Sequence, residues 1–163
     1  MVRIAVLTAS DKGARGERED ASGALVVRRA ETEGHRVVAK VVVPDDRARI
    51  AEQLRAWCDD GVAELILTTG GTGLTERDVT PEATRDVAER DVPGIPLALA
   101  LEGLKKTPYA VLSRGLAVLR RRTLIVNLPG STKAVDEGLD VLFPLLPHIG
   151  ELLAGPHEHG AAD

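Results

Sequence analysis

Cysteine and aromatic residues are scarce in this sequence. Its 163 residues include one cysteine, Cys58, and one residue each of Phe, Tyr and Trp. A single cysteine excludes a disulfide bond within the chain, so we expect a reducing compartment, the cytoplasm. With three aromatic side chains, the core must be filled by Leu, Val, Ile and Ala, and few platforms remain on which nucleic-acid bases could stack.

Basic patches and long apolar runs are also lacking. The formal net charge is −4, and Arg120–Arg122 is the densest basic stretch. Nucleic-acid-binding domains usually carry a basic face, so we expect no nucleic-acid partner, and we interpret the three arginines as a solvated hairpin turn. No apolar run approaches the ~18 residues of a membrane span, and the N-terminal stretch MVRIAVLTAS has the pattern of a strand rather than of a signal peptide. We therefore expect no membrane association.

What is present is an alternation of apolar runs with helical patterns. The apolar runs predict strands over residues 2–8, 36–44, 64–69 and 123–128, with another short strand just before the three arginines. Helical spacing predicts helices over residues 21–32, from 45 past Cys58, over 80–90 and 96–105, and from Ser131 onward, the last one kinked or split at Pro144 and Pro147. This alternation predicts an α/β fold with a mostly parallel central sheet.

The length favours one domain, residues 1–155, followed by a polar C-terminal tail, residues 156–163. His157 and His159 in that tail could chelate a metal, but we interpret the tail as frayed. Cys58 lies on the apolar stripe of its predicted helix, and we interpret it as a buried hydrophobic residue rather than a nucleophile.

Glycines and polar residues follow the predicted strands where each one ends. Thr8 and Ser10 follow the first strand, Asp45 the second, and the glycine-rich run Gly70–Gly73 the third, while Asn127 closes the last. In open α/β sheets, ligands bind outside the carboxyl ends of the strands. The sequence therefore predicts a binding site at this edge of the sheet.

The run Gly70–Gly73 suits close contact between a ligand and the backbone. Glycines adopt positive φ readily, and successive N–H groups can form a nest for an anion. The run matches neither the Walker A loop nor the dinucleotide fingerprint, and a tight strand-to-helix turn is the competing interpretation. Similarly, Ser131 can cap a helix whose N-terminus binds phosphate, with Lys133 near the anion or simply exposed.

Asp45 and Asp78 have two interpretations each. Asp45 can cap the second predicted helix, and Asp78 can pair with Arg77 or Arg114. Alternatively, both carboxylates lie near bound phosphates, where they would repel them unless a cation intervened. Magnesium held by a carboxylate and substrate phosphates is therefore a natural hypothesis.

These motifs resemble the molybdopterin adenylyltransferase family of the MogA type. The string TTGGTG, then LTE and RDVTPEAT, is preceded by PDD and followed by LSRG and NLPGSTK, and the opening LTASDKGARGERED also looks like the family's start. The resemblance extends from Val2 to about Gly155. It implies a three-layer α/β/α sandwich, usually assembled as a homotrimer. It also implies activation of molybdopterin with ATP and Mg²⁺, giving adenylyl-molybdopterin and pyrophosphate, and a molybdate-inserting enzyme that uses the product.

The resemblance also implies roles for individual residues. Asp45 and Asp78 would be the essential carboxylates and the tentative Mg²⁺ ligands. The substrate-binding set would be Thr8, Ser10, Thr69, Gly70, Gly71, Thr72, Gly73, Arg77, Ser113, Arg114, Asn127, Pro129, Gly130, Ser131 and Lys133. Within it, Ser113 and Arg114 would line the pterin side. A non-catalytic molybdopterin-binding carrier and a MoaB-type relative are the alternative interpretations.

Overall fold

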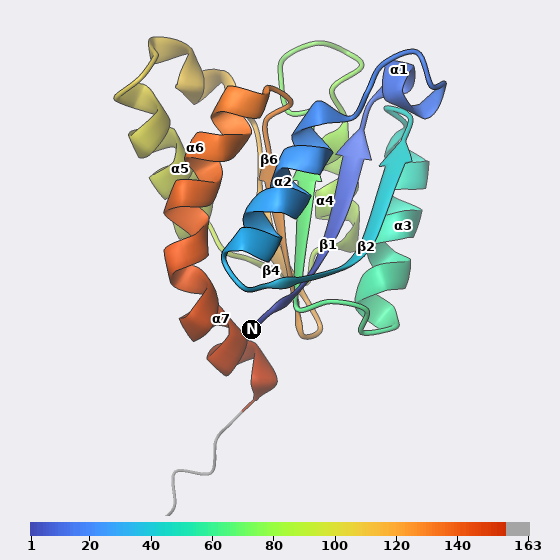
Figure 1. The fold of residues 1–163 in the computed structure, drawn as a ribbon. Helices are drawn as coiled ribbons and strands as arrows, with labels where there is room; N and C mark the ends of the chain where they lie inside the picture. Colours follow the sequence, from blue (N-terminus) through green and yellow to red (C-terminus); the bar gives the residue numbers. More distant parts are fainter. Residues whose placement is uncertain (156–163) are drawn as a thin grey trace, which may run out of the picture.

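A six-stranded sheet forms the centre of the protein in the computed structural model, which describes residues 1–155 (Figure 1). The interpretation of residues 156–163 as a tail concerns residues outside this range. The strands are β1 (Arg3–Ala9), β2 (Arg36–Val43), β3 (Leu65–Thr69), β4 (Arg90–Asp91), β5 (Ala117–Arg120) and β6 (Thr123–Leu128), in the order β2-β1-β3-β6-β5-β4. The first four in this order are parallel, and β5 and β4 are antiparallel, so the mostly parallel sheet is confirmed.

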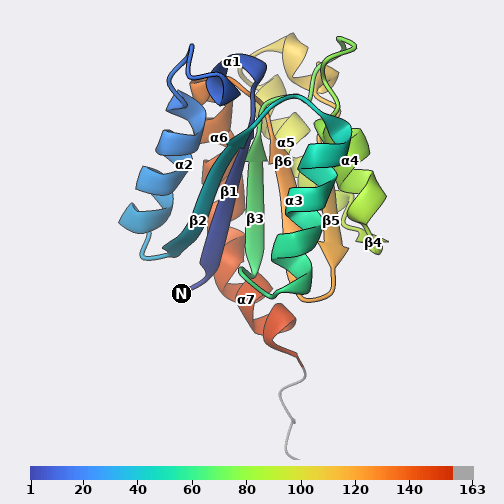
Figure 2. The ribbon, with the colours of Figure 1, turned by 90° about the vertical axis from the view of Figure 1, so that its right-hand side faces the viewer.

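Helices cover both faces of the sheet (Figures 1 and 2). One layer contains α2 (Ala21–Thr32), α5 (Gly94–Leu104), α6 (Thr132–Leu142) and α7 (Leu146–Ala154), and the other contains α3 (Arg47–Asp59) and α4 (Thr80–Val87). Three short helices are also present in residues 1–155: α1 (Asp11–Ala14), η1 (Pro108–Leu112) and η2 (Phe143–Leu145). The predicted three-layer α/β/α sandwich is confirmed.

Each face of the sheet has its own hydrophobic core. Along β1, Ile4 and Val6 pack in the core beneath α2 and α6, while Ala5 and Leu7 pack in the core beneath α3 and α4. Side chains of a strand point alternately to opposite faces, so a sheet covered on both sides needs a continuous apolar run. Cys58 is buried in the second core, as predicted.

Several predicted details are wrong. Asp46, not Asp45, caps α3, because its carboxylate accepts from the backbone N–H of Arg49. Helix α4 starts at Thr80, the first residue of its predicted range, with Val79 in the N-cap position. This helix ends at Val87 and not near residue 90, because β4 pairs there with β5.

The turn at Arg120–Arg122 is a hairpin, but it is not simply solvated. The side chain of Arg120 is only 19% exposed, and its guanidinium pairs with the carboxylate of Asp59 at 2.9 Å. By contrast, the predicted break at Pro144 and Pro147 is confirmed, since η2 separates α6 from α7. Within residues 1–155, no helix combines the length and the apolar character needed to cross a membrane.

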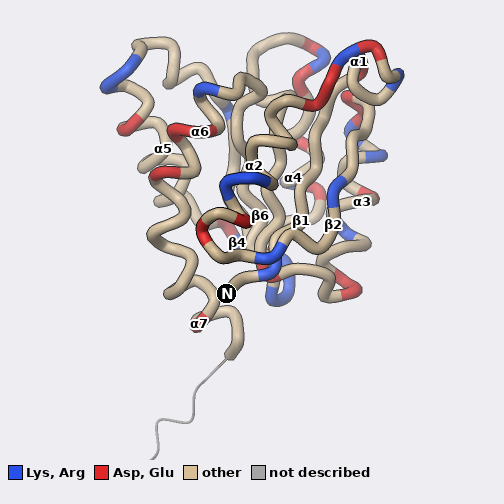
Figure 3. The backbone as a smooth tube through the Cα atoms, in the orientation of Figure 1, with Lys and Arg blue, Asp and Glu red and all other residues tan. Residues whose placement is uncertain are grey.

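The parallel strands place their carboxyl ends along one edge of the sheet, at the top of Figure 1. The loops that follow β1, β2, β3 and β6 therefore meet at this edge. Figure 3 shows acidic and basic residues close together on the loop around α1, beside these strand ends. The sheet thus gathers the polar loops that the sequence had singled out.

Candidate functional site

Two joined pockets lie at this edge of the sheet. The large pocket, about 680 Å³, lies between the loops after β3 and β6 and the segment formed by α5 and η1. The small pocket, about 460 Å³, lies at the ends of β1 and β3, beside the start of α2. They share Gly71, Asp78, Gly130 and Ser131.

Most of the residues expected at the site line one of these pockets. The large pocket is lined by Gly71, Thr72, Gly73, Asp78, Ser113, Asn127, Pro129, Gly130 and Ser131 from that set. The small pocket is lined by Thr8, Ser10, Asp45, Gly70, Gly71, Asp78, Gly130 and Ser131. Four residues of the set line neither pocket: Thr69, Arg77, Arg114 and Lys133.

Gly70 and Gly71 form the turn after β3, and both have positive φ, +85° and +68°. A Cβ on Gly70 would lie 2.5 Å from the carbonyl oxygen of Ala9, and one on Gly71 would lie 2.4 Å from Oγ1 of Thr80. The chain's own packing therefore requires glycine here. The turn is also part of both pockets, so a tight strand-to-helix turn and a ligand-contacting loop are compatible interpretations of it.

Asp45 is held by a reciprocal pair of hydrogen bonds. Its Oδ2 accepts from the N–H of Asp11 at 3.0 Å, and Oδ1 of Asp11 accepts from the N–H of Asp45 at 3.0 Å. Burial raises the pKa of the Asp45 carboxyl, the hydrogen bond from Asp11 lowers it, and the charges of Asp11 and Asp78 raise it again. The raised pKa indicates a carboxylate whose ionised form is poorly solvated, as is common at functional sites.

Asp78 lines both pockets and is oriented by Thr75. Its Oδ2 accepts from the N–H of Thr75 at 3.0 Å and from the Thr75 hydroxyl at 2.8 Å. The pairing with Arg77 or Arg114 is wrong, because Arg77 pairs with Asp11 at 2.6 Å and Arg114 pairs with Glu82. In residues 1–155, no hydrogen bond uses Oδ1 of either Asp45 or Asp78.

Arg114 braces the glycine loop instead of facing the large pocket. Its Nε donates to the carbonyl of Gly73 at 2.7 Å, its Nη2 donates to the carbonyl of Asp78 at 2.7 Å, and its own N–H donates to Thr72 at 2.8 Å. The ion pair with Glu82 of α4 anchors the guanidinium. The planar guanidinium suits this role, because its N–H groups can donate to several acceptors at once.

A buried chain of hydroxyls supports the small pocket. The Thr69 hydroxyl lies 2.8 Å from that of Ser22 and donates to Thr8 at 3.3 Å, and Thr8 donates to Asp20 at 2.9 Å. Asp20 also caps α2 and lies 3.1 Å from Nζ of Lys40. Thr69 therefore acts behind the pocket, by orienting Thr8.

Asn127 of β6 and Ser131 of the loop after it have structural roles. The Asn127 amide donates to Thr68 and Thr84, both at 2.9 Å, and its Oδ1 accepts from the N–H of Leu116 at 3.1 Å, so its polar atoms are already used. Ser131 caps α6, as predicted, by accepting from the N–H of Ala134. Lys133 in the first turn of that helix is exposed.

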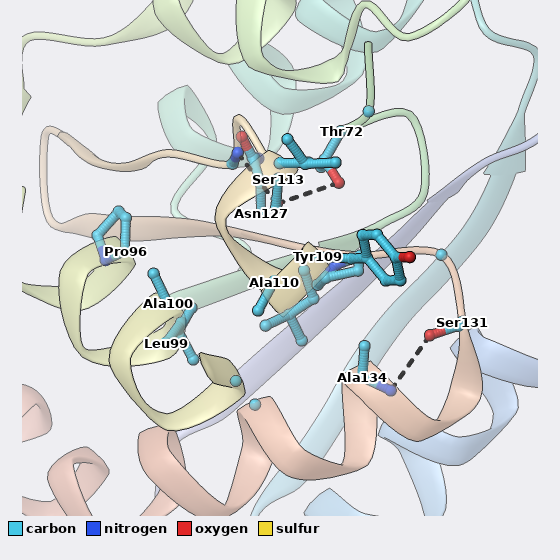
Figure 4. Close-up of a pocket in the computed structure, with 18 of the residues that line it drawn as sticks. Thr72, Pro96, Leu99, Ala100, Tyr109, Ala110, Ser113, Asn127, Ser131 and Ala134 are labelled. Carbon is cyan, nitrogen blue, oxygen red and sulfur yellow. Dashed lines mark hydrogen bonds between the residues drawn. The ribbon is translucent and has the colours of Figure 1, made fainter. Parts of the chain in front are cut away.

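The sequence interpretation missed part of the site. Asp11 looked like one more polar residue of a loop, because only the tertiary structure brings it to Asp45. Asp20 directly precedes the predicted helix over residues 21–32, a position typical of a helix cap, but this position alone did not indicate a residue of the site. The wall supplied by α5 and η1 was also missed; it includes Pro96, Leu99, Ala100, Thr107, Tyr109 and Leu112 (Figure 4).

A family model described as "Probable molybdopterin binding domain" matches residues 5–148. The chain belongs to this molybdopterin-binding domain family. The match spans the ends of β1, β2, β3 and β6, so both pockets lie within the family domain. The resemblance inferred from the sequence motifs is confirmed.

Three relatives illustrate the similarity within this family. The molybdopterin adenylyltransferase of Helicobacter pylori strain J99 is 37% identical over 94% of this chain and 89% of its own length. The molybdopterin biosynthesis enzyme MoaB of Thermus thermophilus is 48% identical, with a TM-score of 0.89 over 96% of this chain and 98% of that structure. The Drosophila melanogaster protein cinnamon is 43% identical over 93% of this chain, which spans 26% of cinnamon's length.

Proposed function

We propose that this protein adenylylates molybdopterin with ATP and releases pyrophosphate. The observation that carries the proposal is the pair of joined pockets, with Asp78 where they meet and Asp45 in the small one. A reaction between two phosphorylated substrates needs two adjacent binding spaces whose reactive ends meet. The similarity to an H. pylori protein named molybdopterin adenylyltransferase supports the same activity.

In the proposed reaction, the terminal phosphate of molybdopterin attacks the α-phosphorus of ATP. A new phosphorus–oxygen bond forms, the bond to the β-phosphate breaks, and pyrophosphate leaves. We infer that the phosphates are bound by the backbone N–H groups of Gly70–Gly73 and by the N-terminus of α6, because both border the shared part of the pockets. Arg77 forms an ion pair with Asp11, which in turn holds Asp45 by two hydrogen bonds. We therefore infer that Arg77 helps to position Asp45.

Asp45 and Asp78 fit Mg²⁺ as a pair of carboxylate ligands. Both line the small pocket, and Oδ1 of each is unused by hydrogen bonds among the described residues. No cluster of three or more His, Cys, Asp or Glu side chains in residues 1–155 is arranged to hold a metal. Mg²⁺ commonly binds through one or two carboxylates and completes its shell with substrate phosphates and water. When bound, it would neutralise the leaving pyrophosphate.

Pyrophosphate release tests the proposal directly. Purified protein is incubated with ATP, MgCl₂ and molybdopterin, and pyrophosphate is measured by a coupled assay. We expect release that requires all three components and is lost when MgCl₂ is replaced by EDTA. Release that does not depend on molybdopterin would indicate hydrolysis of ATP to AMP and pyrophosphate and would contradict the proposal.

A second candidate is a molybdopterin-binding role of the MoaB type, without adenylyl transfer. It is favoured by the 48% identity to the T. thermophilus protein named MoaB. The presence of both Asp45 and Asp78 argues for the enzyme, because a carrier has no need for two carboxylates beside its bound phosphates. Tight binding of molybdopterin with no pyrophosphate release would establish the carrier.

We also propose that the protein assembles as a homotrimer. Leu97, Leu101 and Leu104 on α5 and Val111 on η1 are exposed, and a run of such side chains is typical of a surface that becomes covered. Light scattering coupled to size-exclusion chromatography should give three times the chain mass of 17.3 kDa. We expect Leu101→Glu to shift the particle to the monomer mass.

The product is proposed to pass to a molybdate-inserting enzyme. In cinnamon, a domain similar to this chain makes up about a quarter of a longer protein named for molybdenum cofactor synthesis. In a Synechococcus elongatus bifunctional protein of molybdenum cofactor biosynthesis, it makes up 48% of the length. Fusion of the domain to further segments supports direct use of its product by a neighbouring activity.

A further inference from the structure

Tyr109 is an aromatic residue that the protein does not use for packing. The chain has one Phe, one Trp and one Tyr. Phe143 is buried in the core and Trp57 packs against the other core, whereas Tyr109 is 75% exposed and lines the large pocket. Its hydroxyl makes no hydrogen bond to any of residues 1–155, so no polar contact of its own explains its place.

The segment that carries Tyr109 is well anchored. Pro108 begins η1, and the hydroxyl of Thr107 accepts from the N–H of Tyr109 at 3.3 Å. The next residue, Ala110, packs so closely on α5 that a Cβ on Gly103 would lie 2.7 Å from its methyl group. The backbone beneath the ring is therefore fixed, and the ring itself is presented to the pocket.

The pocket wall across from Tyr109 consists mostly of small residues, with Glu137 of α6 as a charged side chain among them. Gly130, Ser131, Ala134 and Gly138 come from the last loop and from α6. Figure 4 shows Tyr109 on η1 and, across from it, Ser131 and Ala134 at the start of α6. Apolar side chains of α5 and η1 also line this pocket, together with Glu102 and Thr107: Pro96, Leu99, Ala100 and Leu112. An aromatic ring on one side and small groups on the other leave a space suited to a flat ring.

We propose that Tyr109 stacks on the flat heteroaromatic ring of a substrate in the large pocket and thereby sets the affinity for that substrate. Aromatic side chains stack favourably on such rings, and the contact would cover the exposed face of Tyr109. The inference rests on the proposed function, whose substrates both carry a ring of this kind, the pterin of molybdopterin and the adenine of ATP. Tyr109 is then a specificity-determining residue rather than a catalytic one.

The test compares Tyr109→Phe, Tyr109→Leu and Tyr109→Ala in the pyrophosphate assay. Lys106→Ala is the matched control, because Lys106 is an exposed residue just before the same short helix and lines neither pocket. We expect Tyr109→Ala to raise the KM of one substrate by on the order of tenfold, with little change in kcat. Phe should preserve the KM, Leu should recover only part of it, and the control should match the wild type.

The substrate whose KM changes identifies the stacked ring. A higher KM for molybdopterin indicates the pterin, and a higher KM for ATP indicates adenine. Unchanged KM values for both substrates in Tyr109→Ala would overturn the stacking while leaving the proposed function intact. If the wild type releases no pyrophosphate, the proposed function fails, and equilibrium binding of molybdopterin and of ATP replaces the assay. Binding that is equal in wild type and Tyr109→Ala, or absent from both, would then overturn the stacking.

Discussion

Asp11 and Asp45 hold each other in place at the edge of the sheet. Each carboxylate accepts from the other residue's backbone N–H, and both distances are 3.0 Å. Arg77 then binds the remaining oxygen of Asp11 at 2.6 Å. The loops after β1, β2 and β3 are thus tied together by one carboxylate pair, and Asp45 is presented to the small pocket by a residue that does not line it.

We expect Asp11 to act on the reaction through the position of Asp45. Asp11→Ala removes the acceptor for the N–H of Asp45 and should lower kcat about tenfold or more, the usual cost of losing a group that orients a ligand. Asp11→Asn keeps an acceptor at the same place and should lose less. The measurement is kcat and its dependence on Mg²⁺ concentration, for variants with wild-type circular dichroism. An Asp11→Ala variant with unchanged kcat would show that Asp45 needs no such support.

Asp45→Asn should separate activity from stability. Burial raises the folded-state pKa of Asp45 above its unfolded value, so the contribution of this carboxyl to stability is present at low pH and falls as the pH rises through the folded pKa. At pH 7 the neutral Asn avoids the cost of burying an ionised carboxylate, so the Tm of Asp45→Asn should equal or exceed the wild-type value. Any gain in Tm should vanish below the unfolded-state pKa of Asp45, where the wild-type carboxyl is also neutral. Adenylyl transfer should fall by about two orders of magnitude.

The adjacent Asp46 provides the control for this variant. Asp46→Asn keeps a good cap for α3, since Asn and Asp cap helices about equally well. It should therefore keep both Tm and activity. If Asp45→Asn were clearly less stable than Asp46→Asn at pH 7, the assigned cost of ionised Asp45 would be wrong.

Gly70→Ala and Gly34→Ala should differ in stability although their φ angles are alike, +85° and +78°. An alanine at Gly34 meets nothing within 4 Å, so it should cost about 1 kcal/mol from backbone strain alone. At Gly70 the added methyl meets the Ala9 carbonyl at 2.5 Å, which should cost roughly a further 1–3 kcal/mol. Urea unfolding of both variants measures the difference, and equal midpoints would refute the clash.

Arg114→Lys should impair turnover without breaking the fold. Lysine keeps the charge next to Glu82 but cannot donate to the carbonyls of Gly73 and Asp78 together. The loop carrying Asp78 should loosen, and kcat should fall by about tenfold, with a smaller change in KM. Lys133→Ala is a useful comparison, because Lys133 is exposed and lines neither pocket. A larger loss of activity in Lys133→Ala than in Arg114→Lys would reverse this assignment.

The thiol of Cys58 should be inert in the folded protein. The residue is 2% exposed, and burial raises the pKa of the thiol to about 11. An aromatic disulfide reagent should react with it only in urea, and alkylating reagents should leave pyrophosphate release unchanged. Because the folded pKa lies above the unfolded one, stability relative to Cys58→Ala should be fully present below about pH 9 and should decline between pH 9 and about 11.

The local pattern of the chain was sufficient for most secondary structure. The predicted helix over 21–32 coincides with α2, and the glycine turn after β3, the cap at Ser131 and the break at Pro144 were all read from neighbouring residues. Such features depend on periodicity and on backbone preferences within a few positions. The family motifs, likewise, are short runs whose residue types and order can be recognised without coordinates.

The partners of the charged side chains required the tertiary structure. The sequence offered Asp45 as a helix cap and Asp78 as a partner of Arg77 or Arg114, but Asp46 is the cap and Arg77 binds Asp11, 66 residues away. The cap is a local contact that the sequence left open between two adjacent aspartates. The pair of Arg77 with Asp11, by contrast, depends on which loops meet where the parallel strands end. The sequence by itself determined the elements, the class of fold and the edge that carries the site. Only the folded chain decided which side chains face the pockets and which hold them in place, since those contacts form between loops brought together by the sheet.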